Sequence, residues 1–245
     1  MTEGHRRPRR ELPLVQLLPN LLTVAALCAG LTAIRFAITG DFGIAAGLIV
    51  LSAVLDGLDG RLARLLKSES EIGAELDSLG DFVNFGVAPG IMLYLWALHE
   101  MPRAGWIVAL IYICCCLLRL ARFNVISRAV ETEDSNHFQG VPSPAGALLA
   151  MLPLFVAKVF DDSFTIPSAL VAMWMVGIGA LMIGRFKTPS FKKTTVYADQ
   201  VHWMVVAFVA LVAALATYPW ATLLWLDLAY ATMLLVTVFR KKSLN

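Results

Sequence analysis

Eight long apolar stretches, separated by short polar or proline-containing joints, constrain the fold of this chain more than any other feature. A helix needs about 20 apolar residues to cross the hydrocarbon core of a bilayer. With 58% of its 245 residues hydrophobic, the chain is too apolar for a soluble domain of this length. The sequence therefore predicts an all-α integral membrane protein with about eight transmembrane helices, at 14–38, 43–66, 74–98, 104–127, 143–160, 166–185, 201–217 and 219–239.

The basic residues predict how these spans are oriented, because Lys and Arg collect in cytoplasmic loops. One set of alternate connections holds nearly all of them: the N-terminal arginines, Lys67, Arg128, Arg185 to Lys193, and Arg240 to Lys242. We therefore expect both termini on the cytoplasmic side of the cell membrane. We expect a basic segment at 1–13, one transmembrane catalytic domain at 14–239 and a basic tail at 240–245. This layout, with a net charge of only +2, does not indicate nucleic-acid binding.

The joint between the seventh and eighth predicted spans is the shortest. Only Tyr218-Pro219 separates the two apolar stretches. If they formed one long tilted helix, the C-terminal basic residues would reach the opposite side of the membrane.

Two groups of aspartates interrupt the apolar background at the inner ends of the second and third spans. Each charge at membrane depth costs about 2.5 to 3.5 kcal/mol, so their accumulation points to function. Each group of aspartates shares one face of its helix with a few small or basic residues. The first face carries Asp56, Asp59, Gly60, Ala63 and Arg64, and the second, with a repeat of four residues, carries Gly73, Asp77 and Asp81. Because the connection from Lys67 to Ile72 is short, the two rows can face each other as antiparallel neighbours.

Converging carboxylates repel one another, and in a partly dehydrated site they would either bind protons or recruit cations. Ligands that are all oxygen favour hard ions such as Mg²⁺, Mn²⁺ or Ca²⁺ over zinc. The alternative is an ion-pair lattice in which Arg61 and Arg64 neutralise the aspartates and hold the two helices together. Four further acidic residues are expected to be loop or span-end charges without a catalytic role: Asp41, Asp161, Asp162 and Asp227. The scattered histidines and consecutive cysteines show no ligand spacing.

Residues 56–81 read Asp-x-x-Asp-Gly-x-x-Ala-Arg, eight residues, Gly, three residues, Asp, three residues, Asp. This pattern resembles the signature of the CDP-alcohol phosphatidyltransferase family at every position. The resemblance implies a six-helix membrane core, often dimeric, with a site for two divalent ions, Mg²⁺ or Mn²⁺, that is reached from the cytoplasm.

The resemblance also implies roles for individual residues. Asp56, Asp59 and Asp77 would bind the metal ions, and Asp81 would contact metal and act as general base. The residues implied to bind the CDP-lipid are Asn20, Asp56, Gly60, Ala63, Arg64, Gly73 and Asp77. For Asn20, a hydrogen bond between helices is an alternative.

Sequence outside the signature bears on the acceptor alcohol. Four segments resemble the branch of the family that joins CDP-diacylglycerol to L-serine: Asp81 to Pro89, Arg119 to Asn124, Phe138 to Pro144 and Thr188 to Lys192. Arg119, Arg122 and Asn124 lie at the cytoplasmic end of the fourth span, where they could bind the acceptor. The two arginines could equally be cytoplasmic anchors of that span.

Two alternatives stay open from the sequence. The same chemistry could use glycerol 3-phosphate, inositol phosphate or choline as acceptor. A different class of protein is a cation transporter whose carboxylates form the ion path. Against transport, the aspartates lie near one interface in continuous helices. The expected partners are therefore CDP-diacylglycerol, L-serine, membrane lipid and a second copy of the chain.

Overall fold

The structure, a computed structural model, describes residues 17–66, 68, 70–129, 138–161, 163, 165–184, 187–188 and 201–242. The predicted basic segment 1–13 and the last three residues of the predicted tail lie outside the described residues. Nine α-helices form the described part: α1 (Leu18–Ile38), α2 (Phe42–Leu65), α3 (Glu71–Asp81), α4 (Ala88–Leu93), α5 (Pro102–Ala129), α6 (Ser143–Val159), α7 (Ser168–Ile183), α8 (Val201–Thr217) and α9 (Pro219–Lys242).

One π-helical segment, Phe82–Val87, joins α3 to α4, and a second, Tyr94–Leu98, continues α4, so that one continuous rod runs from Glu71 to Leu98. Two-residue strands β1 (Phe138–Gln139) and β2 (Lys187–Thr188) pair antiparallel, with Phe138 opposite Thr188. The sequence predicted neither feature. The short pairing joins two connections that precede α6 and follow α7, and all other regular elements of the described residues are helices.

Each of the eight predicted spans coincides with a helical segment of the described chain, with ends that differ by a few residues. Five segments are long and apolar enough to cross a membrane: α1, α2, the α3–α4 rod, α5 and α9. Helices α6, α7 and α8 are apolar but shorter. The prediction of an all-helical, multi-pass membrane protein is confirmed.

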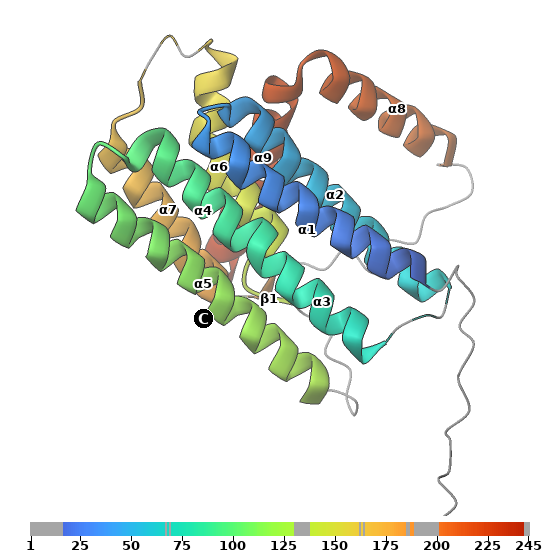
Figure 1. Cartoon of the computed structure of the whole chain (residues 1–245). Helices are drawn as coiled ribbons and strands as arrows, with labels where there is room; N and C mark the ends of the chain where they lie inside the picture. The colour runs from blue at the N-terminus through green and yellow to red at the C-terminus, as the bar shows by residue number, and fades with distance from the viewer. Residues whose placement is uncertain are drawn as a thin grey trace, which may run out of the picture.

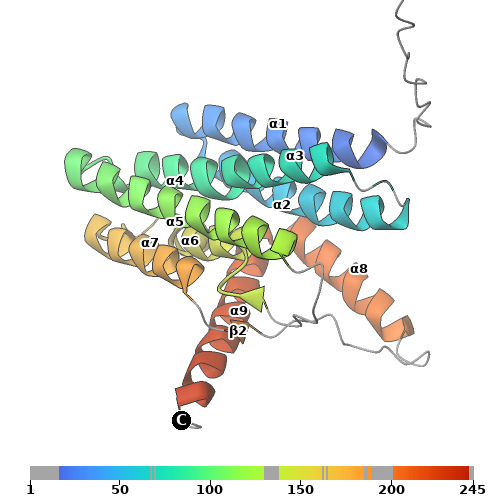
Figure 2. The same ribbon diagram turned by 90° about the horizontal axis from the view of Figure 1, so that it is seen from below.

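Helices α8 and α9 are two separate helices, as predicted from Tyr218-Pro219. Helix α8 ends at Thr217 and α9 begins at Pro219, where the proline lacks a backbone donor that the first helical turn does not need. The two helices diverge at this joint, and α8 projects from the body of the molecule (Figure 1, Figure 2).

The remaining helices form a bundle in which α1, α2, the α3–α4 rod and α5 run lengthwise beside one another, above α6 and α7 (Figure 2). Small residues allow α1 and α2 to approach closely, since Ala33, Ala37, Ala45 and Ala46 are all buried. Gly40 supplies the turn between these helices with a φ of +87°, which residues with a Cβ rarely adopt.

Asp227 corrects one expectation from the sequence, which placed it at a span end. It lies inside α9 and is only 5% exposed. Among the described residues, its Oδ2 has no hydrogen-bond partner. The carboxyl shares an inward-facing stripe of α9 with Leu223 and Leu234, so the packing of α9 against α6 buries it.

Leu154 in α6 is fully buried in this bundle, whereas Leu170 in α7 is 52% exposed. We expect Leu154→Ala to lower the free energy of unfolding by about 2 to 5 kcal/mol, because it leaves a cavity. Leu170→Ala, the same chemical change at an exposed position, should alter stability little. Unfolding midpoints in detergent micelles measure both effects, and equal midpoints for the two variants would contradict this packing.

Candidate metal and nucleotide site

The four aspartates of the two predicted rows meet between α2 and α3. Oxygen atoms of Asp56, Asp59 and Asp77 all lie within 4.8 Å of one another. The side chain of Asp56 is within hydrogen-bonding reach of both Asp77 and Asp81. The structure thus confirms that the two rows face each other, as their helical spacing predicted.

The connection between α2 and α3 sets this arrangement. The backbone N–H of Ser68 donates to the carbonyl oxygen of Ala63 at 3.0 Å, which turns the chain immediately after α2. Ser70 then caps α3, its hydroxyl accepting from the N–H of Gly73 at 3.0 Å. Because α3 starts at a fixed point, Asp77 and Asp81 lie beside Asp56 of α2 on successive turns, and Gly73, one turn earlier, lies beside Asn20 of α1.

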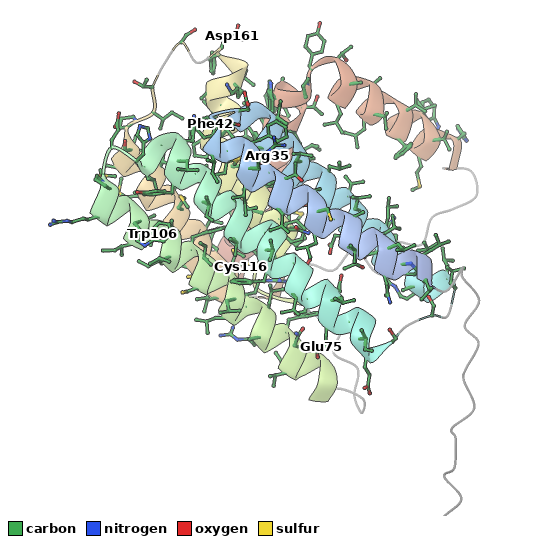
Figure 3. The ribbon with its side chains drawn as sticks, in the orientation of Figure 1. Arg35, Phe42, Glu75, Trp106, Cys116 and Asp161 are labelled. Carbon is green, nitrogen blue, oxygen red and sulfur yellow. The ribbon has the colours of Figure 1, made fainter. Side chains whose placement is uncertain are left out.

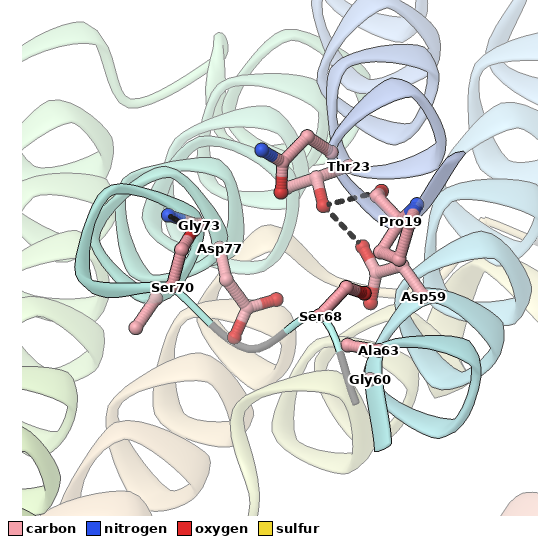
Figure 4. Close-up of a pocket in the computed structure, with 11 residues that line it drawn as sticks. Pro19, Thr23, Asp59, Gly60, Ala63, Ser68, Ser70, Gly73 and Asp77 are labelled. Carbon is pink, nitrogen blue, oxygen red and sulfur yellow. Dashed lines mark hydrogen bonds between the residues drawn. The ribbon is translucent and has the colours of Figure 1, made fainter. Parts of the chain in front are cut away.

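Thr23 of α1 holds Asp59 in place. Asp59 is only 3% exposed, and the Thr23 hydroxyl donates to its Oδ2 at 2.6 Å (Figure 4). The same hydroxyl lies 3.1 Å from the carbonyl oxygen of Pro19. Thr23 was not predicted as a site residue, although it lies three residues after Asn20 and so on the same face of a helix.

A pocket of about 290 Å³ opens beside the aspartates (Figure 4). Five of the residues that the family resemblance implied to bind the CDP-lipid line it, together with Asp59: Asn20, Gly60, Ala63, Gly73 and Asp77. A Cβ at Gly73 would lie 2.9 Å from Oδ1 of Asn20, so glycine lets α1 and α3 approach here.

Other residues that line the pocket were not predicted: Pro19, Thr23, Ser68, Ser70 and Ala74. The Ser68 hydroxyl is buried and, among the described residues, has no hydrogen-bond partner. A buried hydroxyl without a partner costs free energy that a polar ligand would recover. Serine in a polar connection carries no signal in the sequence that separates it from an ordinary loop residue.

Arg64 is placed differently from the other signature residues. Its side chain is exposed, and its Nε donates to the carbonyl oxygen of Gly60 in the same helix at 3.0 Å. It is not among the residues that line the described pocket. Arg61 is exposed as well. Neither arginine is therefore placed to neutralise the aspartates, which disfavours the ion-pair lattice.

Arg119 is the predicted acceptor residue that lies beside the aspartates. It is close enough to Asp81 for a direct electrostatic interaction, and its Nη1 donates to the hydroxyl of Ser143 at the start of α6. Within the described residues, Nε of Arg119 and Oδ1 of Asp81 are both buried without a hydrogen-bond partner. A ligand that both donates and accepts hydrogen bonds would satisfy both atoms.

Arg122 and Asn124 instead join helices. Nη1 of Arg122 donates to the carbonyl oxygen of Ile183 at the end of α7, at 2.9 Å. Nδ2 of Asn124 donates to the hydroxyl of Ser78 in α3, at 2.7 Å. The structure therefore brings Arg119 to the aspartates and gives the other two residues contacts between helices.

The site can hold a hard cation. Three carboxylates within 4.8 Å of one another provide the oxygen ligands that Mg²⁺ and Mn²⁺ prefer. The adjoining pocket has polar and small residues on its walls and an orphan hydroxyl at its edge. Together they can accommodate a phosphate-bearing ligand whose negative charge lies next to the ion.

Comparison with known proteins agrees with this chemistry. The sequence profile of the CDP-alcohol phosphatidyltransferase family matches residues 16–184. The CDP-diacylglycerol–serine O-phosphatidyltransferase of Mycobacterium tuberculosis H37Rv is 39% identical over 220 residues, covering 88% of this chain and 76% of its own. Enzymes with the same name from Helicobacter pylori 26695 and Bacillus subtilis 168 are each 36% identical over 177 residues, or 72% of this chain. The match covers 73% and 92% of those proteins.

The bond from Thr23 to Asp59 gives a direct test of the metal site. We expect Thr23→Val to weaken Mn²⁺ binding by about tenfold or more, because a residue that orients a ligand carboxylate contributes to affinity. Thr32→Val is the matched control, since the Thr32 hydroxyl donates to the Cys28 carbonyl oxygen in its own helix. Mn²⁺ titrations followed by electron paramagnetic resonance measure both, and unchanged affinity in Thr23→Val would count against the assignment.

Proposed function

The chain belongs to the CDP-alcohol phosphatidyltransferase family, and on that basis we propose that it transfers the phosphatidyl group of CDP-diacylglycerol to the hydroxyl of L-serine. The released product is CMP. The observation that carries the proposal is the meeting of four aspartates beside a nucleotide-sized pocket in a chain whose relatives are named for this reaction.

The family is generally dependent on divalent metal ions, and the acidic cluster fits such ions. We assign Asp56, Asp59 and Asp77 as ligands, with a further contact from Asp81, to two ions of Mg²⁺ or Mn²⁺. When bound, these ions would supply positive charge that stabilises the phosphate under attack and the departing CMP. Thr23 keeps Asp59 in the orientation that binding requires, through the 2.6 Å hydrogen bond.

The CDP portion occupies the pocket beside the ions. Asn20, Gly60, Ala63 and Gly73 form its walls, and the orphan hydroxyl of Ser68 is available to the nucleotide. Lining residues without large side chains allow a flat ligand to approach the helix backbones. The lipid chains of the substrate would leave the pocket toward the membrane.

Asp81 takes the proton in the proposed reaction. The serine hydroxyl oxygen forms a bond to the phosphorus that carries the lipid, and the bond from that phosphorus to the CMP oxygen breaks. The hydroxyl proton passes to Oδ1 of Asp81, which is buried and has no other hydrogen-bond partner in the described chain. Asp81 is suited to this role because it lies on the side of the cluster that faces Arg119.

Arg119 is the residue that we assign to the serine carboxylate. Its Nη1 is engaged by Ser143, while its buried Nε is available to an anionic group. Arg122 and Asn124, which were also predicted as acceptor contacts, would act indirectly by joining α5 to α7 and to α3. An amino acid placed between Arg119 and Asp81 would present its hydroxyl to the base and its carboxylate to the guanidinium.

The positions of the basic residues support an orientation of the protein in the membrane. The end of α2, the start of α3 and the start of α6 lie at the same end of the bundle as the aspartates, and basic residues flank these connections. By the positive-inside rule, this end faces the cytoplasm of the cell membrane, as do both termini. We propose one catalytic domain over 14–239, between basic segments 1–13 and 240–245. The family resemblance supports a homodimer.

The acceptor is tested by supplying candidate alcohols separately to the purified protein with CDP-diacylglycerol and Mn²⁺. We expect CMP release with L-serine and little release with glycerol 3-phosphate, inositol phosphate or choline. Phosphorylated acceptors carry additional negative charge, for which the Arg119 Nε is a poor match as the one unpartnered guanidinium atom beside the aspartates in the described residues. Release with a phosphorylated acceptor and none with serine would contradict the proposal.

The role of Asp81 is tested by Asp81→Asn. We expect the turnover number to fall by about a hundredfold or more, since a general base contributes that much. Binding of Mn²⁺ and CDP-diacylglycerol should be retained in part, because Asp56, Asp59 and Asp77 still form the cluster. Asp41→Asn, in the exposed turn before α2, is the control. Near-normal CMP release from Asp81→Asn would show that another group takes the proton.

A further inference from the structure

The rod that carries Asp77 and Asp81 has a proline in its interior. Pro89 has no backbone N–H, so it cannot donate to the carbonyl oxygen of Phe85, four residues earlier. Just before Pro89 the helix widens into the π-helical segment Phe82–Val87, in which the N–H of Ala88 donates to the carbonyl oxygen of Val83. This segment begins at the residue after Asp81.

Tyr112 of α5 supplies the donor that Pro89 lacks. Its hydroxyl donates to the carbonyl oxygen of Phe85 at 2.8 Å, and its side chain is fully buried. A buried tyrosine hydroxyl needs a partner, and a carbonyl deprived of its helical donor needs one too. The single bond therefore satisfies two groups and ties the π-helical segment to α5.

Other contacts hold the rod against α5 on both sides of Asp81. Toward the start of the rod, Asn124 donates to the hydroxyl of Ser78 at 2.7 Å. Beyond Asp81, the rod packs closely against α5, since a Cβ added at Gly86 would lie only 3.2 Å from Cβ and Sγ of Cys116. Figure 3 labels Cys116 in α5, beside the rod. Arg119 follows Cys116 by one helical turn and interacts with Asp81.

The π-helical segment also controls how the residues around it are turned about the rod axis. A π-helical turn holds more residues than an α-helical turn, so it shifts the facing of side chains on either side of it. In this register Asn84 is buried against α1. The contact is so close that a Cβ added to Gly30 of α1 would overlap the side-chain amide of Asn84. Asp81, directly before the segment, lies close enough to Asp56 and Arg119 to interact with both.

We propose that Tyr112 is a positioning residue for the transfer reaction: by holding the Phe85 carbonyl, its hydroxyl maintains the π-helical turn that aims Asp81 at the acceptor site. Tyr112 touches neither metal nor substrate in this scheme and acts through the backbone of the rod. The inference rests on the proposed function, because it gives Tyr112 a part in placing the general base.

A second helix of the described chain, away from the aspartates, has an interior proline whose missing hydrogen bond is replaced by a side chain from a neighbouring helix. Pro153 lies inside α6 and cannot donate to the carbonyl oxygen of Leu149, four residues earlier. Nε1 of Trp174 in α7 donates to that oxygen at 2.7 Å. Trp174→Phe therefore removes the same kind of bond as Tyr112→Phe, from a proline-interrupted helix that carries none of the four aspartates.

The test compares Tyr112→Phe with Trp174→Phe in the full chain, in mixed micelles with CDP-diacylglycerol, L-serine and Mn²⁺. We expect both variants to lower the unfolding midpoint to a similar extent. Tyr112→Phe should also lower kcat by about tenfold to a hundredfold, because a small displacement of a reacting group has that effect. The KM of Tyr112→Phe for CDP-diacylglycerol and its Mn²⁺ affinity should stay within about twofold of the values of the unmodified protein. The kcat of Trp174→Phe should likewise stay within about twofold of the kcat of the unmodified protein.

A second variant covers the case in which Tyr112→Phe folds poorly. Adding Pro89→Ala restores a backbone N–H that can donate to the Phe85 carbonyl in an α-helical register. We expect the double variant to regain stability while kcat stays low, since the π-helical turn is no longer imposed. Recovery of full kcat in the double variant would overturn the proposal, as would equal kcat values in Tyr112→Phe and Trp174→Phe.

The assay separates failure of this inference from failure of the proposed function. If the unmodified protein shows no serine-dependent CMP release, the proposed function is wrong. If the unmodified protein is active and the two single variants lose kcat equally, or not at all, only the positioning role of Tyr112 is wrong.

Discussion

The repulsion among four carboxylates inside an apolar helical bundle is the constraint on which the rest of this structure depends. Asp56, Asp59 and Asp77 present oxygens within 4.8 Å of one another, and Asp81 adjoins them. Such a cluster in an apolar bundle needs positive charge, and Arg61 and Arg64 are both exposed rather than buried with it. In the proposed reaction, divalent ions and the phosphate groups of the CDP-lipid would supply this charge balance.

The helical bundle meets this requirement by bringing four helices together at one end. The α1 helix provides Thr23, which orients Asp59, while α2 and α3 provide the carboxylates. The α5 helix holds the far side of the rod and places Arg119 beside Asp81, the proposed base. A site at a helix end near the membrane surface can receive an anchored lipid and a water-soluble alcohol together.

Much of this arrangement follows from the sequence because it depends on local periodicity. Apolar length gave the positions of the helices, and the spacing of the aspartates placed each row on one face. Contacts between distant residues were not predictable in the same way. The bond from Thr23 to Asp59 spans 36 positions. The π-helical turn depends on a tyrosine from another helix, and Arg119 and Arg122 look alike in sequence although only Arg119 reaches Asp81.

The most direct measurement of the central claim is the location of bound Mn²⁺ in crystals of the protein grown with CDP-diacylglycerol, by anomalous scattering. We expect anomalous peaks within coordination distance of Asp56, Asp59 and Asp77, with the diphosphate of the lipid on the pocket side. An absence of peaks between α2 and α3 in crystals that contain the ordered CDP-lipid would contradict a metal-dependent site. Arginine side chains paired with the aspartates in that complex would contradict it equally.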